Sequence, residues 1–309
     1  MNEFKDGVRF LLRVLTRNPF VREVLLALAQ SKLLPKFLWR RLPVETTFLV
    51  SLPNGNSFKY SAIADDAIAR AIFWCGWDGW EPETMQVFYK LAQKSKLFLD
   101  IGANTGLFTL VTLAANPQAK VMAFEPVPQV YKRLLSHIEI NGWSDRCQTK
   151  NLAVSNTVGE TKLHIPFEDV PLSASLNPEG FRGYEGYLID INVTRIDTIC
   201  SPNEPIDLIK IDAEGFDDKV LEGMLQVLSN SAPNIIVECN YDGPCIAVET
   251  ILKKFGYRFF HLRPEEPVAM NKIVPDENKL YRNYLCTVRD DWEEVKCLQP
   301  QAKTISSRR

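Results

Sequence analysis

The residue types best suited to chemistry gather where predicted buried strands end. At the first strand end, Asp100 is followed by the turn Gly102-Ala103-Asn104-Thr105-Gly106, and a helix is predicted from Leu107. Gly102 and Gly106 let the backbone approach a ligand closely, and a turn between strand and helix is the ligand-binding point of doubly wound sheets. The spacing G-x-x-x-G differs from the G-x-G-x-x-G that binds a pyrophosphate. Asp100 would repel a phosphate and suits a cationic amino group.

A second acid, Glu125, closes the next predicted strand 25 residues after Asp100. A carboxylate at this position can accept hydrogen bonds from both hydroxyls of a ribose, as in dinucleotide folds. Pro126 ends the strand by removing a backbone donor. Taken alone, Glu125 could be a solvated loop acid, but the preceding turn favours the ribose.

A third strand end carries Lys210, Asp212 and Glu214 at alternating positions. Alternation places the three side chains on one side if the extended backbone persists. Burying such charges without compensation costs several kcal/mol, so we expect mutual pairing or a ligand. A purely structural Lys–Asp pair is the alternative. Glu238 and Asn240 add polar groups at a fourth strand end.

The elements that must position these residues alternate between strands and helices. Helical patterns cover 107–115, 129–141, 217–228 and 247–255. We therefore predict an α/β fold: a doubly wound, mostly parallel seven-stranded sheet with helices on both faces, its last two strands pairing antiparallel. The predicted strands are Leu97–Ile101, Lys120–Phe124, Cys147–Leu152, Ile206–Ile211, Asn234–Glu238, Tyr257–Leu262 and Tyr284–Val288.

The chain divides into four predicted regions. Residues 1–45 form a basic amphipathic helical extension, and residues 46–95 form a hairpin around Asn54-Gly55 followed by a helical lead-in. Residues 96–298 form the main domain, with a β-rich insertion at about 156–199, where specificity often resides. The polar residues 299–309 are a predicted disordered tail.

Charge and composition restrict the classes of function. With 46% hydrophobic and 24% charged residues the chain is globular, and a net charge of −2 argues against nucleic acid as a partner. Seven cysteines without a C-x-x-C suggest a reducing compartment. We find no membrane-spanning run and no signal peptide, so we expect a cytoplasmic protein.

The N-terminal region departs from this average. Residues 1–42 hold nine Lys/Arg against three Asp/Glu, a net charge of +6. Apolar residues recur between the arginines at helical spacing, which is typical of a peripheral helix on an anionic membrane. The alternative is a helix that packs on the main domain with its arginines solvated.

Four sequence blocks resemble the signature blocks of FkbM-type methyltransferases, which are class I enzymes dependent on S-adenosylmethionine. The resemblance covers about residues 55–290, in family order and spacing, and includes the lead-in Trp80-Glu81-Pro82-Glu83. Asp217 departs from it, because the family usually has Glu there. The blocks are DIGANTG (100–106), FEP (124–126), IKIDAEG (209–215) and IIVE (235–238).

The resemblance implies a role for each matching residue toward the cofactor. The turn 102–106 would hold the methionine part, with Asp100 near its amino group, and Glu125 would hold the ribose. Two residues after the third strand would lie near the adenine. The implied cofactor-binding residues are Asp100, Gly102, Asn104, Gly106, Glu125, Asn151, Ala153 and Asp212.

The resemblance also implies a catalytic set of Lys210, Asp212 and Glu214, with the two acids near the sulfonium and the incoming hydroxyl. Methyl transfer is an in-line displacement that needs alignment and a base for the hydroxyl proton. None of the three histidines falls in the blocks, so we expect a carboxylate base. Oxygen ligands from Asp212, Glu238 and Asn240 could bind Mg²⁺, but a metal-free carboxylate site explains the same residues, and the metal ligands stay unassigned.

The expected function is O-methylation of a hydroxyl on a sugar or glycosylated metabolite; the sugar rests on family analogy alone. One alternative is a nicotinamide-dependent oxidoreductase, which the missing third glycine and Asp100 disfavour. Another is a non-catalytic cofactor-binding module, which would not need Asp212 and Glu214.

Overall fold

The structure is a computed structural model. It describes residues 18–30, 33, 42–64, 66–167, 171, 174–176, 185–201, 204–278 and 280–289. The predicted tail 299–309 and most of the basic N-terminal region lie outside the described residues.

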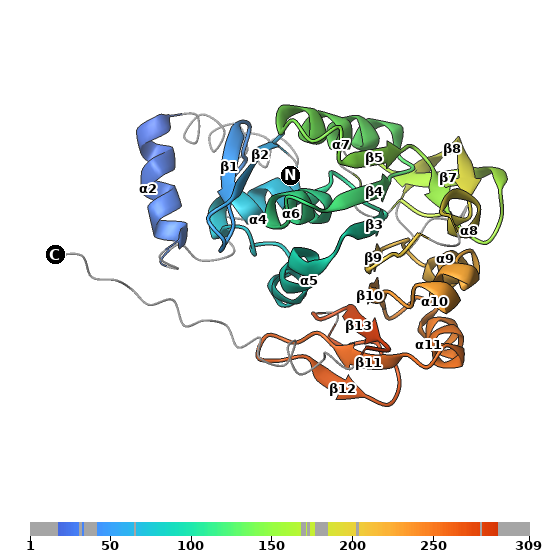
Figure 1. Cartoon of the computed structure of the whole chain (residues 1–309). Coiled ribbons are helices and arrows are strands. Elements are labelled where there is room, and N and C mark those ends of the chain that lie inside the picture. Colours follow the sequence, from blue (N-terminus) through green and yellow to red (C-terminus); the bar gives the residue numbers. More distant parts are fainter. Residues whose placement is uncertain are drawn as a thin grey trace.

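A twisted sheet of eight strands forms the centre of the molecule (Figure 1). Its first five strands are parallel, and the remaining three pair antiparallel. Every residue of the three central strands is buried, as expected for parallel strands covered on both faces. In spatial order the strands are β5 (Cys147–Lys150), β4 (Lys120–Phe124), β3 (Leu97–Ile101), β9 (Leu208–Ile211), β10 (Asn234–Glu238), β13 (Asn283–Thr287), β11 (Arg258–His261) and β12 (Val268–Met270).

The predicted α/β class is confirmed, and so is the antiparallel pairing of the last two predicted strands. The predicted number of seven strands is wrong, because β12 adds an eighth at the edge. This strand has only three residues, none of them buried, and is too short to show a strand pattern in the sequence.

Helices cover both faces of the sheet. The helices on one face share a hydrophobic core with the lead-in, and those on the other face form a second core. The first set is α4 (Ala67–Cys75), α5 (Pro82–Lys94), α6 (Leu107–Ala115) and α7 (Pro128–Ile140), and the second is α8 (Ile196–Ile199), α9 (Asp217–Glu222), α10 (Leu225–Asn230) and α11 (Cys245–Lys254).

The single helix predicted over 217–228 is instead two helices, α9 and α10, that meet at Gly223. A Cβ at Gly223 would lie 2.0 Å from the carbonyl oxygen of Ser155. The close approach of the backbone to Ser155 explains the glycine, and a glycine inside a helical pattern also weakens the helix.

The predicted hairpin is present as β1 (Thr47–Ser51) and β2 (Ser57–Ser61), paired antiparallel. Its turn is fastened to the last residues of α6, since Asn54 and Asn56 donate to the carbonyls of Ala115 and Ala114. The hairpin, α4 and α5 share one continuous core with the sheet, so the lead-in packs directly on one of its faces.

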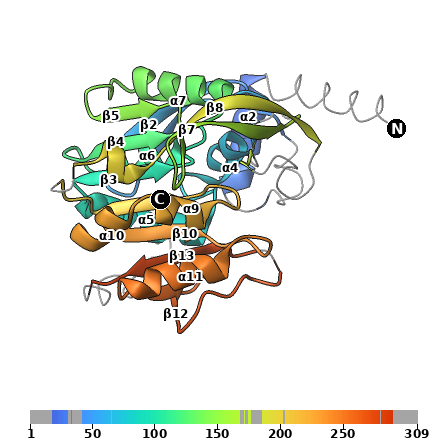
Figure 2. The same ribbon diagram turned by 90° about the vertical axis from the view of Figure 1, so that its right-hand side faces the viewer.

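The insertion forms a second sheet of β6 (Ala153–Val154), β8 (Gly186–Thr194) and β7 (Gly159–Pro166), in that spatial order. Both views place it beyond the carboxyl ends of β3 and β4 (Figures 1 and 2). At the other side of the molecule lies α2 (Pro19–Gln30), beside the hairpin. None of the helices in the described part of the chain has the length and apolar character needed to cross a bilayer.

Candidate active site

A cavity of about 330 Å³ opens at the carboxyl ends of the parallel strands. Its walls come from the loops after β3, β4 and β9, from the last residue of β10, from the insertion, and from the residues just before α5. Eight residues predicted for the site line this one cavity: Asp100, Gly102, Asn104, Glu125, Ala153, Lys210, Asp212 and Glu214.

Two residues predicted to bind the cofactor do not line the cavity. A Cβ at Gly106 would lie 2.5 Å from Leu134 of α7, so this glycine makes room for helix packing. The amide of Asn151 donates to the carbonyls of Glu125 and Pro126 and so fixes the loop after β4. Both residues therefore support the loops that form the cavity without lining it themselves.

The turn after β3 is held closely against its neighbours. Gly102 has a φ of 76°, and a Cβ there would lie 2.0 Å from the carbonyl oxygen of Asp212. Asn104 adopts a φ of 50°, in the left-handed region that non-glycine residues rarely enter. Its backbone N–H donates to Glu125 over 2.8 Å. The turn therefore presents a fixed backbone to the cavity.

Asp100 reaches the base of the turn and is only 1% exposed. Its Oδ2 accepts hydrogen bonds from the backbone N–H and the hydroxyl of Thr109 in α6, at 3.1 and 2.7 Å. Burial raises the pKa of Asp100 to about 6, against those two hydrogen bonds. A cation at this end of the cavity would favour the ionised carboxylate.

Glu125 joins the loops after β3 and β4. One carboxylate oxygen accepts the N–H of Asn104 and the other accepts the N–H of Val127, each over 2.8 Å. Burial raises the pKa of Glu125 to about 7, although both hydrogen bonds favour the charged form. The oxygens retain lone pairs for the two hydroxyls of a ribose.

Lys210 is a charged residue inside a buried central strand. Its Nζ lies 3.5 Å from Oδ2 of Asp212 and over the ring of Phe108. Burial alone would lower the pKa of Lys210, but the carboxylates of Asp212 and Glu81 outweigh burial and raise it, so the ammonium stays charged. The other oxygen of Asp212, Oδ1, is buried without a hydrogen-bond partner, and Asp212 lines the cavity.

The extended backbone expected from Lys210 to Glu214 does not persist. Strand β9 ends at Ile211, and Glu214 has a φ of 44°. The turn still brings carboxylate oxygens of Asp212, Glu214 and Glu238 within 4.8 Å of one another. The three acids are therefore neighbours through a tight turn.

Further polar residues surround this acidic cluster. Asn240 turns its Nδ2 to Glu238 at 2.6 Å, and Arg282 lies 3.6 Å from the same carboxylate. Burial, with the nearby acids, raises the pKa of Glu238. Asp217, which departs from the family pattern, accepts the N–H of Ala213 at 3.1 Å and so fixes the turn.

Glu81 is a cavity residue to which the sequence assigned no role. It precedes α5 with a φ of 45°, and its carboxylate accepts a hydrogen bond from Asn283 of β13 at 3.0 Å. Burial raises the pKa of Glu81 to about 7. Proline after the acid signals the start of a helix, but no local signal predicts a contact between residues 202 positions apart.

Acidic groups dominate the lining of the cavity. Such a surface favours a cationic ligand and opposes a pyrophosphate. The ionisable lining residues are the acids Glu81, Asp100, Glu125, Asp212, Glu214 and Glu238 and the bases Lys210 and Arg282.

The doubly wound sheet and the acid-lined cavity at its carboxyl edge define an α/β protein that binds a small ligand. The model of the methyltransferase FkbM domain matches residues 100–259, which is more than half of the chain. The chain therefore belongs to the FkbM methyltransferase family and is an S-adenosylmethionine-dependent methyltransferase.

Named relatives agree with this family. Methyltransferase sdnD of Sordaria araneosa is 27% identical over 196 residues, which cover 54% of this chain and 75% of the relative. Hexuronic acid methyltransferase AglP of Haloferax volcanii is 26% identical over 159 residues, 51% of this chain and 62% of the relative. 2-O-methyltransferase NoeI of Sinorhizobium fredii is 27% identical over 159 residues, which cover 47% of this chain and 64% of the relative.

Among solved structures, the methyltransferase FkbM from Methylobacillus flagellatus KT aligns with 18% identity and a TM-score of 0.39. The alignment covers 62% of this chain and 43% of that chain.

Proposed function

We propose that this methyltransferase methylates a hydroxyl of a sugar or of a glycosylated small molecule. The observation that carries the proposal is the acidic cluster of Asp212, Glu214 and Glu238, whose oxygens converge within 4.8 Å. Carboxylates so placed can accept the proton that a hydroxyl loses on methylation. The acceptor class draws support from two relatives, one named a hexuronic acid methyltransferase and the other a 2-O-methyltransferase.

The order of the strands in the sheet sets the order of the polar groups along the cavity. Glu125 follows β4, the turn with Gly102 follows β3, and Asp212 follows β9, so these groups lie in sequence along the carboxyl edge. We assign the ribose to Glu125, the methionine part to the turn and Asp100, and the reacting centre to Asp212. Ala153 lines the end of the cavity assigned to adenine. The acceptor then enters on the β10 side.

The cavity fits this cofactor electrostatically, because S-adenosylmethionine carries a sulfonium and an ammonium and the lining is acidic. When bound, the cofactor supplies the methyl group of its sulfonium, and the rest of the cofactor leaves as a neutral thioether. Asp212 or Glu214 takes the acceptor's hydroxyl proton as the new oxygen–carbon bond forms and the sulfur–carbon bond breaks. Lys210 keeps Asp212 oriented through their 3.5 Å pair.

The same three carboxylates suit a hard divalent cation such as Mg²⁺. Asn240, considered as a further oxygen ligand, donates its Nδ2 to Glu238. The metal question is therefore one for experiment: loss of activity with EDTA and its recovery with Mg²⁺ would assign a cation to the cluster.

The proposal is tested with methyl-labelled S-adenosylmethionine and a panel of neutral glycosides, uronic acid glycosides and amino sugars. We expect label on an oxygen of at least one glycoside, located by mass spectrometry, and much less label with whichever of Asp212→Asn and Glu214→Gln removes the base. Label on nitrogen alone across the panel would contradict O-methylation while leaving the methyltransferase class intact.

We also propose that the N-terminal region contacts an anionic membrane surface. Phe20, Val24 and Leu28 follow one another at i, i+4 and i+8 in α2, and their exposed fractions are 75%, 45% and 36%. Leu25 packs against the core instead, so α2 is anchored by one side and leaves an apolar stripe outside. The net charge of +6 over residues 1–42 complements anionic lipids.

A further inference from the structure

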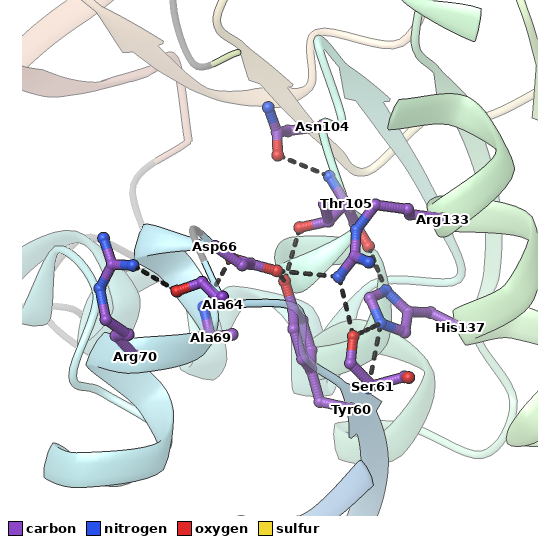
Figure 3. A network of polar contacts seen from close by, with 10 residues as sticks. All are labelled: Tyr60, Ser61, Ala64, Asp66, Ala69, Arg70, Asn104, Thr105, Arg133 and His137. Carbon is purple, nitrogen blue, oxygen red and sulfur yellow. Dashed lines mark hydrogen bonds and ion pairs between the residues drawn. The ribbon is translucent and has the colours of Figure 1, made fainter. Parts of the chain in front are cut away.

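A buried polar network lies directly behind the turn that follows β3 (Figure 3). Its centre is Thr105, whose side chain is fully buried. All three polar groups of Thr105 have partners: the N–H donates to Asn104 Oδ1 at 2.8 Å, the hydroxyl contacts Tyr60 Oη at 2.6 Å, and the carbonyl contacts His137 Nδ1 at 2.7 Å. Tyr60 comes from β2 and His137 from α7, so two distant elements grip one residue of the turn.

The direction of the bonds follows from the chemistry of the groups. Tyr60 has one hydroxyl proton, which it donates to the carboxylate of Asp66 at 3.2 Å. The hydroxyl of Thr105 must therefore donate to Tyr60. Asp66 also accepts a hydrogen bond from Arg133 at 3.0 Å. As the N-cap of α4, it accepts a further one from the N–H of Ala69. The chain of donors ends on an acid that is fully buried and fixed from three sides.

His137 is fixed as one tautomer. The carbonyl of Thr105 can only accept, so Nδ1 carries the proton. Nε2 lies 3.1 Å from both the N–H and the carbonyl oxygen of Ser61, and in the neutral ring it accepts the N–H. Burial lowers the pKa of His137, which keeps the ring neutral. Arg133 donates to the carbonyl of Ser61 at 2.8 Å and closes the network.

We propose that Tyr60, Asp66 and His137 are positioning residues for the cofactor turn. None of the three lines the cavity, so each acts through Thr105. Tyr60 and Asp66 also lie outside residues 100–259, the part matched by the family model. The inference rests on the proposed role of the turn in holding the cofactor.

The turn needs such support because Asn104, next to Thr105, has a left-handed backbone. A conformation of this kind persists only where the surroundings impose it. The same residue donates its N–H to Glu125, so a shift of the turn would also move the group assigned to the ribose. Releasing Thr105 should therefore weaken cofactor binding by loosening a preorganised site.

The first test compares two Tyr→Phe variants by calorimetric titration with S-adenosylmethionine. Tyr60→Phe removes the hydroxyl that holds Thr105, and the control Tyr257→Phe removes a buried hydroxyl that donates to Pro233 at 3.0 Å, away from the cavity. Both variants lose a buried hydrogen bond, so both should melt at a lower temperature. Only Tyr60→Phe should bind more weakly, with a Kd about tenfold higher. A Kd within twofold of the wild type would overturn the inference.

A second test uses His137. In His137→Asn the side-chain amide can replace Nδ1–H as donor to Thr105, whereas His137→Leu cannot. We expect the Asn variant to bind S-adenosylmethionine more tightly than the Leu variant, a rescue that a purely space-filling role would not produce. Equal affinity of the two variants would contradict a positioning role.

Hydrogen exchange reports the coupling from the opposite direction. Since coupling between sites is reciprocal, S-adenosylhomocysteine should slow amide exchange over residues 57–64 in the wild type and less so in Tyr60→Phe. If the wild type binds S-adenosylhomocysteine but amide exchange over residues 57–64 does not change, the positioning role is wrong and the cofactor assignment stands. A wild type that binds neither compound would contradict the cofactor assignment itself.

Discussion

Replacing Glu125 with Gln should weaken S-adenosylmethionine binding in a way that depends on pH. The substitution removes a charged acceptor, which is worth about 1.5–3 kcal/mol per hydrogen-bonded group. At pH 8 the Kd should therefore rise by about 10- to 150-fold. Asp276→Asn is the matched control, because Asp276 also accepts two backbone N–H groups, from Leu280 and Tyr281, but does not line the cavity.

The pH dependence follows from the pKa of about 7 that burial gives Glu125. At pH 6 most of the wild type holds Glu125 protonated, and the proton must leave before the carboxylate can accept both ribose hydroxyls. Each pH unit below that pKa costs about tenfold in affinity. The gap between wild type and Glu125→Gln should therefore narrow by about tenfold between pH 8 and pH 6. Titration calorimetry at both pH values measures the gap, and an equal gap at both would refute the reasoning.

Further predictions concern turnover, stability and membrane contact. Asp212→Asn and Glu214→Gln should keep the circular dichroism of the wild type, and the variant that removes the base should lower turnover by about 10²–10⁴-fold in the labelled-methyl assay. Burial raises the pKa of Glu81 to about 7 and that of Asp217 to about 6, so the folded state binds more protons than the unfolded state. Stability should then fall as pH rises from about 5 to 7.5, which thermal melts without ligand would show. The protein should sediment with anionic vesicles at low salt and not at high salt, and Ser at the exposed apolar positions of α2 should reduce sedimentation; no binding at low salt would end the membrane proposal.

The sequence predicts the sheet and most of the cavity because the signals there are local. Buried parallel strands read as nearly continuous apolar runs, and a polar residue that lines the cavity stands at the end of the strand or just after it, as with Asp100, Glu125 and Asp212. The carboxyl ends of parallel strands meet at one edge, so the strand pattern alone brings these residues together.

What the sequence could not predict depends on contacts between distant segments. In the sequence, Gly106 looks like a glycine that lets the backbone approach a ligand, whereas in the structure it makes room for Leu134. The bond between Glu81 and Asn283 joins the lead-in to the strand at 283–287, and no pattern announces it. Likewise Tyr60 alternates with the polar residues Lys59 and Ser61 as a buried hairpin residue does, and its place behind the turn follows only from the packing of the hairpin.

The backbone itself marks the functional region. Among the described residues, four non-glycine residues have a positive φ, and three of them line the cavity: Glu81, Asn104 and Glu214. Each lies in a different loop, Glu81 before α5, Asn104 after β3 and Glu214 after β9. Strain of this kind costs of order 1–3 kcal/mol per residue and persists only where packing imposes it. The fold thus holds three polar groups at one cavity against local preference, which is expected where geometry serves binding and catalysis. The lead-in supplies Glu81 and, through Tyr60, support for Asn104. For that reason the working unit of this enzyme extends beyond residues 100–259 to include the hairpin and the start of α5.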